Sequence, residues 1–350
     1  MMSTTTPVIS IDLRLDPEAR WAEFGHEYRF IIRELLKRTR KEALETYGPL
    51  YVGAAEVGLG SMSRVYGGHE YVRELKGLSA AAGVSLRDLY LANITYDIAS
   101  YVMPPGQPIG CTGMIHGGPP SPMISRNMDW VFPNGVGAQS MVFRFFDDHG
   151  EYLSVGFPGV TGVVSAISSH GFALTVNQAP HASSAFFGTK AFDSLRSLPT
   201  LWLTRLAMDS GESFDAALDV ITTTPAASSC YLLVAGREPD EAVRIISRGT
   251  SDDVMKVGKE HYAVVANHEP GEEQEYESEE GDSYERYLAL EKAGGRVASG
   301  DVAAAKTALS KWPVCHADTV HQMIMLPATG ELHLRCPHRG QRTYSRYSVG

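Results

Sequence analysis

Three residues that could act together in nucleophilic chemistry lie within twenty positions of one another: Cys111, Arg126 and Asp129. The cysteine opens an alternating run of small and apolar residues that turns through Gly-Gly-Pro-Pro-Ser-Pro and then returns. This pattern predicts a β-hairpin whose first strand begins at the thiol and whose return strand brings Arg126 and Asp129 close to the sulfur. The thiolate is the attacking species and an unperturbed cysteine has a pKa of about 8.5, so a nearby guanidinium would favour the reactive form.

The same residues also fit a purely structural role. Most cysteines are small buried hydrophobes, and an arginine and an aspartate at this spacing are ordinary surface composition. A non-catalytic binding protein in which Cys111 is merely an accessible thiol therefore stays an alternative from outside the enzymes. Self-cleavage would separate the two, because a binding protein has no reason to cut its own chain.

The motif resembles a known enzyme class. Cys111-Thr112 at a strand start, followed by Arg126-Asn127-Met128-Asp129-Trp130, is similar to the N-terminal-nucleophile cysteine hydrolases. Within them the nearest group contains acid ceramidase and N-acylethanolamine-hydrolysing acid amidase, and a Leu-rich helix ending in Asn93-Ile94-Thr95-Tyr96-Asp97 strengthens that likeness. The resemblance implies that the precursor cuts itself between Gly110 and Cys111. The freed α-amino group would then serve as the general base.

Further site residues follow from the same resemblance. Asn267 ends the apolar strand 261–268, where a side-chain amide could donate to a developing oxyanion. Arg286 matches the position that holds the cysteine environment in the family. Asn177, at the end of another strand, resembles a polar residue of the bile-salt hydrolase pocket, although a polar strand-end residue is an equally good interpretation. Arg126 and Asp129 would orient the thiol and the amine.

Apolar side chains cluster in sequence around the reactive centre and could line an acyl pocket. They are Met114, Met128, Trp130, Val131 and Phe132. Some residues of such a set normally belong to the protein core. We therefore expect the set to contribute to an acyl pocket, but not every one of its residues to line it.

Composition limits the other classes. The 350 residues are 43% hydrophobic and carry a formal net charge of -10, which suits a globular protein and argues against a nucleic-acid partner. The chain shows neither a signal peptide nor 18 consecutive apolar residues, so we expect a cytoplasmic protein, or a secreted one if a leader precedes the given sequence. Cys315-His316 and Cys336 with His338 match no usual zinc spacing, and the predicted chemistry needs neither a metal nor an organic cofactor.

The surrounding elements must position the hairpin. We expect a strand at 8–13, an amphipathic helix at 17–46, a break in the Gly-rich interval 53–68 and a Pro-rich linker at 103–108 before the nucleophile. The long helix carries a basic cluster, residues 33–41, that could contact an anionic membrane, although a solvated face is the default. Residues 269–285 hold nine acidic and no basic side chains, which indicates a solvated loop or, alternatively, a rim around the leaving amine.

Strands in the middle and at the end of the chain, with helix pairs between them, predict an α+β fold. The resemblance sharpens this to the αββα sandwich of N-terminal-nucleophile hydrolases, with a mostly helical N-terminal segment. Residues 1–110 would form one subunit, released or retained after self-cleavage, and residues 111–350 would form the catalytic segment.

The preferred function is hydrolysis of the amide bond of an N-acyl amide, such as a fatty-acyl ethanolamide, an N-acyl amino acid or a ceramide-like lipid. The substrate would be a small lipid-like molecule. An acyltransferase of the isopenicillin N acyltransferase type and a penicillin or bile-salt amidase remain alternatives, since the nucleophile is the same in all of them.

Overall fold

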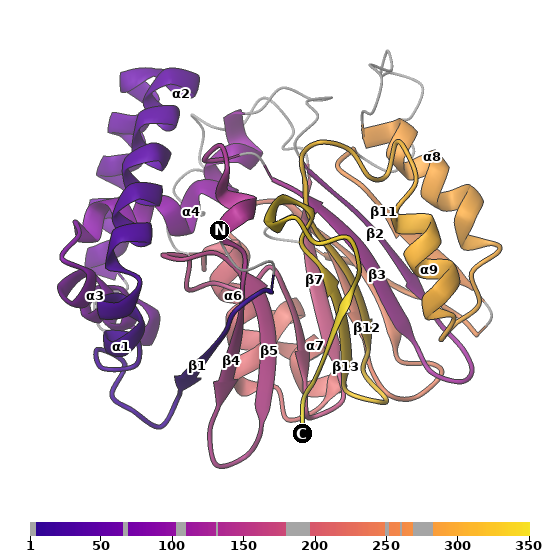
Figure 1. The fold of residues 1–350 in the computed structure, drawn as a ribbon. Coiled ribbons are helices and arrows are strands. Elements are labelled where there is room, and N and C mark those ends of the chain that lie inside the picture. Colours follow the sequence, from indigo (N-terminus) through magenta and orange to yellow (C-terminus); the bar gives the residue numbers. More distant parts are fainter. Residues whose placement is uncertain are drawn as a thin grey trace.

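Two β-sheets stacked face to face form the centre of the molecule, and helices cover both outer faces, as the computed structural model shows (Figure 1). The structure describes residues 5–65, 69–102, 110–130, 132–179, 197–248, 252–259, 261–268 and 283–350. The expected linker at 103–108 and residues 269–282 of the acidic segment lie outside these ranges. No helix in the described part of the chain is long and apolar enough to span a membrane.

The first sheet has eight strands in the order β1-β4-β5-β6-β7-β8-β9-β10. Its strands are β1 (Val8–Asp12), β4 (Met141–Phe146), β5 (Glu151–Gly156), β6 (Ser165–Ser168), β7 (Ala173–Gln178), β8 (Cys230–Ala235), β9 (Ala242–Ser247) and β10 (Asp252–Lys256). All neighbours pair antiparallel except β1, which adds to β4 in parallel. The N-terminal strand expected at 8–13 is therefore confirmed, and it ties the start of the chain to the catalytic segment.

The second sheet has six strands in the order β11-β2-β3-β12-β13-β14. Its strands are β2 (Gly110–His116), β3 (Met123–Asp129), β11 (Tyr262–Val265), β12 (Thr319–Leu326), β13 (Glu331–Arg335) and β14 (Ser345–Ser348). The predicted hairpin at the thiol is the β2–β3 pair, with Cys111 opposite Met128 and Gly110 opposite Asp129.

The helices lie in two layers. Figure 1 shows α1 (Ala22–Glu27), α2 (Arg29–Val65), α3 (Glu70–Ala82) and α4 (Leu86–Val102) on one side of the sandwich, with α8 (Ser283–Gly294) and α9 (Val302–Leu309) on the other. The helices α6 (Thr200–Ser210) and α7 (Phe214–Thr223) pack on the eight-stranded sheet with α1–α4. Short 3-10 turns, η1 (Val136–Gln139) and η2 (Pro337–Arg339), complete the described elements.

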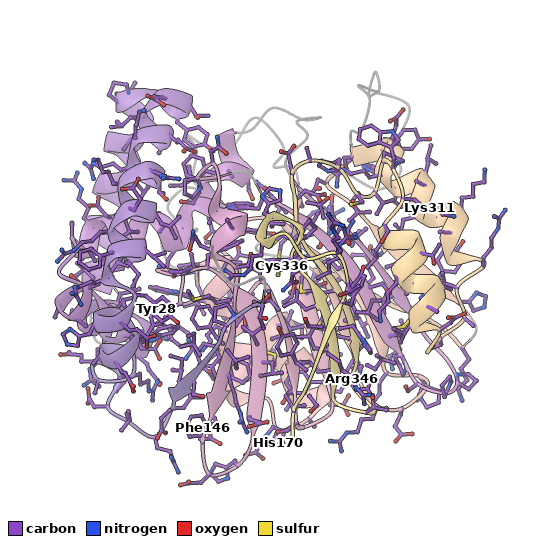
Figure 2. The ribbon with its side chains drawn as sticks, in the orientation of Figure 1. Tyr28, Phe146, His170, Lys311, Cys336 and Arg346 are labelled. Carbon is purple, nitrogen blue, oxygen red and sulfur yellow. The ribbon has the colours of Figure 1, made fainter. Side chains whose placement is uncertain are left out.

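Strand alternation explains the three large apolar clusters among the described residues, which lie beside a small fourth one of Ala43, Val52 and Phe132. Successive side chains of a strand point to opposite faces, and here both faces of each sheet are covered. On β8, for example, Leu232 packs under the helices whereas Leu233 packs between the sheets. On β2, Ile115 faces the other sheet and Met114 faces α8 and α9. Cys336, labelled in Figure 2, is buried in the core between the two sheets.

The long N-terminal helix differs from its prediction. The helical segment α2 does not stop before the Gly-rich interval but runs to Val65, and it is interrupted at Gly48, whose φ is 78°, directly before Pro49. Proline disfavours the helical conformation of the residue before it, and glycine tolerates a positive φ. The Gly-Pro pair therefore breaks the helix, whereas the later glycines are accommodated inside it.

Candidate active site

The thiol of Cys111 lies at the start of β2 and points between the sheets. Cys111 pairs with Met128 across the hairpin, and Arg126 lies two positions before Met128 on β3, so its side chain is on the same face of the sheet as the thiol. The Nη2 atom of Arg126 donates to Cys111 Sγ at 2.6 Å. Arg126 is fully buried, and its guanidinium also donates to the carbonyl oxygens of Val164 at 3.0 Å and Val176 at 2.8 Å and to the hydroxyl of Ser165. These contacts fix the guanidinium beside the sulfur.

Burial has the larger effect on the reactivity of this thiol. It raises the pKa of Cys111, and the charge of Arg126 opposes that shift only in part. Arg126 thus favours the thiolate, as expected, but burial opposes it and has the larger effect on the pKa of Cys111. A base that removes the thiol proton is needed, because a buried thiolate costs desolvation energy that a single cation does not recover.

Asp129 does not lie beside the sulfur as predicted. It directly follows Met128, the residue that pairs with Cys111, so alternation sends its side chain to the opposite face of the sheet, toward α8. There its carboxylate lies 3.2 Å from Arg286 Nη1 and accepts from Thr319 Oγ1 at 2.7 Å. Arg286 also donates to the hydroxyl of Thr112, the residue after the nucleophile, at 2.6 Å.

Asn267 contacts both the backbone nitrogen of Cys111 and Arg286, whose side chain lies on the α8 side of the sheet. Its Oδ1 atom accepts from the backbone N of Cys111 at 2.7 Å and from Arg286 Nη2 at 3.2 Å. Its Nδ2 atom donates to the carbonyl of Gln178 at 2.8 Å, and its own backbone N–H donates to Ser283 at the start of α8. In the uncleaved chain this side-chain amide holds the nitrogen of Cys111, and its role as an oxyanion donor stays a prediction.

Gly110 is closely packed against this amide. A Cβ at Gly110 would lie 1.8 Å from Asn267 Oδ1 and 2.3 Å from Asn267 Cγ. Only glycine fits before the nucleophile while Asn267 keeps its place.

Asn177 has unused hydrogen-bonding capacity. It is fully buried on β7, and neither its Oδ1 nor its Nδ2 has a hydrogen-bond partner among the described residues. A buried amide without a partner loses the hydrogen bonds that it would make in water. Such a group is suited to receive a ligand, and the substrate-binding role of Asn177 stays a prediction.

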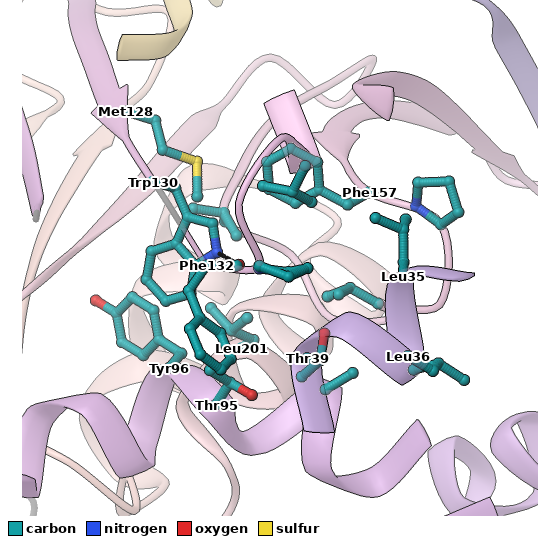
Figure 3. Close-up of a pocket in the computed structure, with 16 residues that line it drawn as sticks. Leu35, Leu36, Thr39, Thr95, Tyr96, Met128, Trp130, Phe132, Phe157 and Leu201 are labelled. Carbon is teal, nitrogen blue, oxygen red and sulfur yellow. Dashed lines mark hydrogen bonds between the residues drawn. The ribbon is translucent and has the colours of Figure 1, made fainter. Parts of the chain in front are cut away.

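An apolar cavity lies beside Met128, the residue that pairs with Cys111 across the hairpin (Figure 3). Met128, opposite Cys111, lines it, as does Val164, whose carbonyl accepts from Arg126. Its other walls come from α2, α4, α6 and the loops after β3 and β5, and they are Leu35, Leu36, Thr39, Ala92, Thr95, Tyr96, Trp130, Phe132, Pro133, Val136, Phe157, Pro158, Val160 and Leu201. The cavity measures about 50 Å³.

The structure brings three of the predicted pocket residues together and leaves one out. Met128, Trp130 and Phe132 line the cavity, and Trp130 stacks against Tyr96 of α4 with ring centroids 6.3 Å apart. Met114 packs instead with α8 and α9 on the far face of the sheet, because it is an odd number of positions from Cys111. Val131 lies outside the described residues.

Sequence reasoning missed several neighbours of the site. Tyr96 lines the cavity, and its hydroxyl is buried with no hydrogen-bond partner among the described residues. Its sequence signal was its place in the Asn-x-x-Tyr-Asp segment. His316 was considered only for a zinc site, and nothing in the sequence linked it to Asp129, although its Nε2 lies 3.2 Å from Asp129 Oδ2. In the described chain, no group of three or more His, Cys, Asp or Glu residues could hold a metal ion.

The basic cluster at 33–41 is largely engaged within the protein. Arg33 donates to the carbonyl of Ala82, and three of the other cations contact acidic side chains. These are Arg38 with Glu34, Arg40 with Asp88, and Lys41 with Glu45. Membrane contact by this helix stays a prediction.

Comparison with known proteins supports one family. Residues 117–301, slightly more than half of the chain, match the family described as acyl-coenzyme A:6-aminopenicillanic acid acyl-transferase. The chain is similar to N-acylethanolamine-hydrolyzing acid amidase of Mus musculus, with 23% identity over 254 residues, or 71% of this chain and 66% of the relative. It is also similar to acid ceramidase of Homo sapiens, with 21% identity over 288 residues, or 75% of this chain and 70% of the relative. The chain thus spans about two thirds of the length of these curated relatives.

A solved structure shares the fold. The Caenorhabditis elegans ortholog of N-acylethanolamine-hydrolyzing acid amidase superposes with a TM-score of 0.54 at 16% identity, covering 69% of this chain and 100% of that chain. Together with the two stacked sheets and the helices on both outer faces, this confirms the predicted αββα sandwich.

Proposed function

Because the chain belongs to the acyl-coenzyme A:6-aminopenicillanic acid acyl-transferase family, we propose that it is a self-processing amidohydrolase that cleaves N-acyl amides with Cys111 as its N-terminal nucleophile. One observation carries the proposal. The thiol and the backbone nitrogen of Cys111 are each held by a different side chain. Arg126 contacts Cys111 Sγ at 2.6 Å, and Asn267 Oδ1 contacts Cys111 N at 2.7 Å. A buried structural cysteine needs no guanidinium at its sulfur, and the nitrogen that Asn267 holds is the one that cleavage would free.

Self-cleavage would begin at the bond between Gly110 and Cys111. The sulfur attacks the Gly110 carbonyl carbon, a C–S bond forms, the C–N bond breaks, and the departing nitrogen takes a proton to become the α-amine of Cys111. Water then hydrolyses the thioester and releases the carboxyl group of Gly110. The products are segments 1–110 and 111–350.

The helical segment would stay bound after cleavage. The Glu74 carboxylate on α3 lies 3.1 Å from Arg205 on α6, and both side chains are fully buried. Arg205 also pairs with Asp209 at 2.8 Å, and Asp209 accepts from the hydroxyl of Tyr71 on α3. Segment 1–110 also supplies cavity residues of α2 and α4, so its loss would open the acyl site.

In turnover, the α-amine of Cys111 acts as the general base for its own thiol. An α-amino group has a pKa of about 7.7 to 8.0, close to working pH, and can therefore accept the proton that the buried thiol must lose. Asn267, supported by Arg286 and Asp129, holds this amine in place. Asn177 Nδ2, which has no partner among the described residues, is the better candidate for donating to the oxyanion.

The acyl group of the substrate would occupy the cavity beside Met128. Its lining is apolar apart from hydroxyls such as that of Tyr96, which suits a hydrocarbon chain and not a charged group. The names of the relatives point to N-acylethanolamines and ceramides as substrate classes of those proteins. The cavity volume of about 50 Å³ holds only a few methylene groups, so a long chain would have to part α2 from α4 and the facing loops.

Acyl transfer is the second candidate, because the matched family is described as an acyl-transferase. The acyl-Cys111 thioester is common to both reactions, and only the species that accepts the acyl group differs. Water gives hydrolysis, whereas an amine or a thiol gives transfer.

Denaturing mass spectrometry of the purified protein tests the mechanism. We expect fragments of residues 1–110 and 111–350 from the wild type and one whole chain from Cys111→Ala. A wild-type chain that stays whole after long incubation at acidic and neutral pH, yet is active, would exclude the N-terminal-nucleophile mechanism.

A substrate panel tests the specificity. It compares acylethanolamides of short, medium and long chains with a ceramide, an N-acyl amino acid, a conjugated bile salt and penicillin V, each with and without an added amine acceptor. Preference for the bile salt or penicillin V by tenfold in kcat/KM would overturn the lipid-amide assignment. Product partitioning toward the added amine would favour the transferase.

A further inference from the structure

A histidine that is distant in sequence from the nucleophile borders the buried carboxylate behind it. His316 Nε2 lies 3.2 Å from Asp129 Oδ2, and the histidine side chain is only 7% exposed. The same carboxylate oxygen lies 3.2 Å from Arg286 Nη1, so two nitrogen groups share it. Nε2 of His316 makes no hydrogen bond to any described residue, which leaves Asp129 as its nearest acidic neighbour.

The orientation of the imidazole is fixed from its other side. The backbone N–H of His316 donates to Thr319 Oγ1 at 3.1 Å, and the same hydroxyl donates to Asp129 Oδ1 at 2.7 Å. His316 Nδ1 accepts from the backbone N–H of Asp318 at 3.4 Å. His316 Nδ1 also lies 3.7 Å from Asp318 Oδ2, so each ring nitrogen has a carboxylate oxygen near it.

A continuous chain of contacts leads from this histidine to the reactive nitrogen. Asp129 contacts Arg286, Arg286 Nη2 donates to Asn267 Oδ1 at 3.2 Å, and the same Oδ1 accepts from Cys111 N at 2.7 Å. Of the side chains in this chain of contacts, Asp129 and Arg286 are fully buried. A shift of the carboxylate would therefore move the guanidinium and then the amide that holds Cys111.

We infer that His316 is a positioning residue for the α-amine of Cys111, acting through Asp129, Arg286 and Asn267. This inference rests on the proposed function. Thr319 holds Oδ1 of Asp129 by a hydrogen bond, and the imidazole edge of His316 packs 3.2 Å from Oδ2, the oxygen that Arg286 contacts. The imidazole therefore limits how far Oδ2 can move from its place beside the guanidinium. Without the imidazole, Oδ2 has only Arg286 as a partner among these groups and can follow its motion.

The test compares two substitutions at the site with a matched control. His316→Leu removes the polar contact, whereas His316→Gln keeps an N–H near the place of Nε2. His333→Leu is the control, since His333 Nε2 lies at the same 3.2 Å from the Glu331 carboxylate, on β13 and outside the proposed machinery. Rates of self-cleavage, kcat and KM are measured for each, with the folded fraction determined separately.

We expect His316→Leu to slow self-cleavage and kcat roughly tenfold with KM within twofold, and His316→Gln to recover most of that loss. The control should keep wild-type rates. Wild-type rates in His316→Leu, or a loss that matches its folded fraction, would overturn the inference.

A second measurement does not depend on activity. In crystals of the Cys111→Ala chain, adding His316→Leu should displace Asn267 Oδ1 from the backbone N of residue 111, and an unchanged contact would overturn the inference. If the wild type neither cleaves itself nor turns over any amide, the proposed function fails, and this crystallographic comparison still decides the role of His316.

Discussion

Replacing Gly110 with alanine tests the geometry of the cleavage site most directly. The new Cβ would lie 1.8 Å from Asn267 Oδ1, 2.3 Å from its Cγ and 2.9 Å from its Nδ2. These distances are shorter than any van der Waals contact, so the Asn267 side chain must turn away. Gly110→Ala therefore removes Asn267 from the nucleophile without altering Asn267 itself.

The cost follows from the hydrogen bonds that Asn267 loses. Its amide accepts from Cys111 N and from Arg286, and it donates to the carbonyl of Gln178. A neutral hydrogen bond contributes about 1 kcal/mol net, and one to a charged group about 2 kcal/mol. Two of the first kind and one of the second give a loss of about 4 kcal/mol in the free energy of unfolding.

Urea denaturation of four chains in a Cys111→Ala background measures this value, because the background keeps the chain whole. The four are the background, Gly110→Ala, Asn267→Ala and the double variant. We expect each single change to cost about 4 kcal/mol and the second change to add less than about 1 kcal/mol, since alanine at 267 vacates the space. With Cys111 restored, Gly110→Ala should also stop self-cleavage, as judged by intact mass.

Two results would refute this reasoning. One is a cost below about 1 kcal/mol for Gly110→Ala, which would mean that the strand absorbs the methyl group by moving. The other is strict additivity in the double variant, which would mean that Gly110 and Asn267 do not compete for the same space.

Three further predictions concern buried polar groups. Arg205→Met should lower the free energy of unfolding by about 3 to 5 kcal/mol, because Glu74 and Asp209 lose a buried cation; a loss below about 1 kcal/mol in urea denaturation would contradict this. Asn177→Leu should lower kcat about 10² to 10³ fold without lowering the thermal midpoint, because its amide makes no hydrogen bond to the described residues; unchanged kcat would exclude an oxyanion role. Burial lowers the pKa of His321 to about 3, against about 6.5 when unfolded, so its contribution to stability is complete above pH 6.5 and falls by about 1.4 kcal/mol per pH unit toward pH 3. His321→Gln should flatten the dependence of unfolding free energy on pH between 6 and 4, and an equal slope in both proteins would refute the assignment.

The sequence by itself determined the elements that depend on local pattern. Alternation and the Gly-Pro turn located the β2–β3 hairpin, and the apolar run ending in an amide located Asn267 after β11. The strand at the N-terminus was predicted for the same reason. A period of two is set by the pleat of the strand, so it can be read without knowing what the strand packs against.

The alternation of side chains along a strand would already have corrected two predictions made from the sequence. Asp129 and Met114 are each placed so that alternation sends them away from Cys111 Sγ, and the structure has both on the α8 side of the sheet. Proximity along a hairpin was a poorer guide than the face of the strand.

Only the tertiary structure decided the contacts that join distant segments and the electrostatic result. Asn267 Oδ1 meets Cys111 N across 156 positions, and His316 meets Asp129 from a loop with no motif of its own. The direction of the Cys111 pKa also depends on burial by residues from both sheets and from the helices, which outweighs the one arginine that the sequence could indicate. Desolvation is set by everything that surrounds a group, and a local pattern records only its neighbours along the chain.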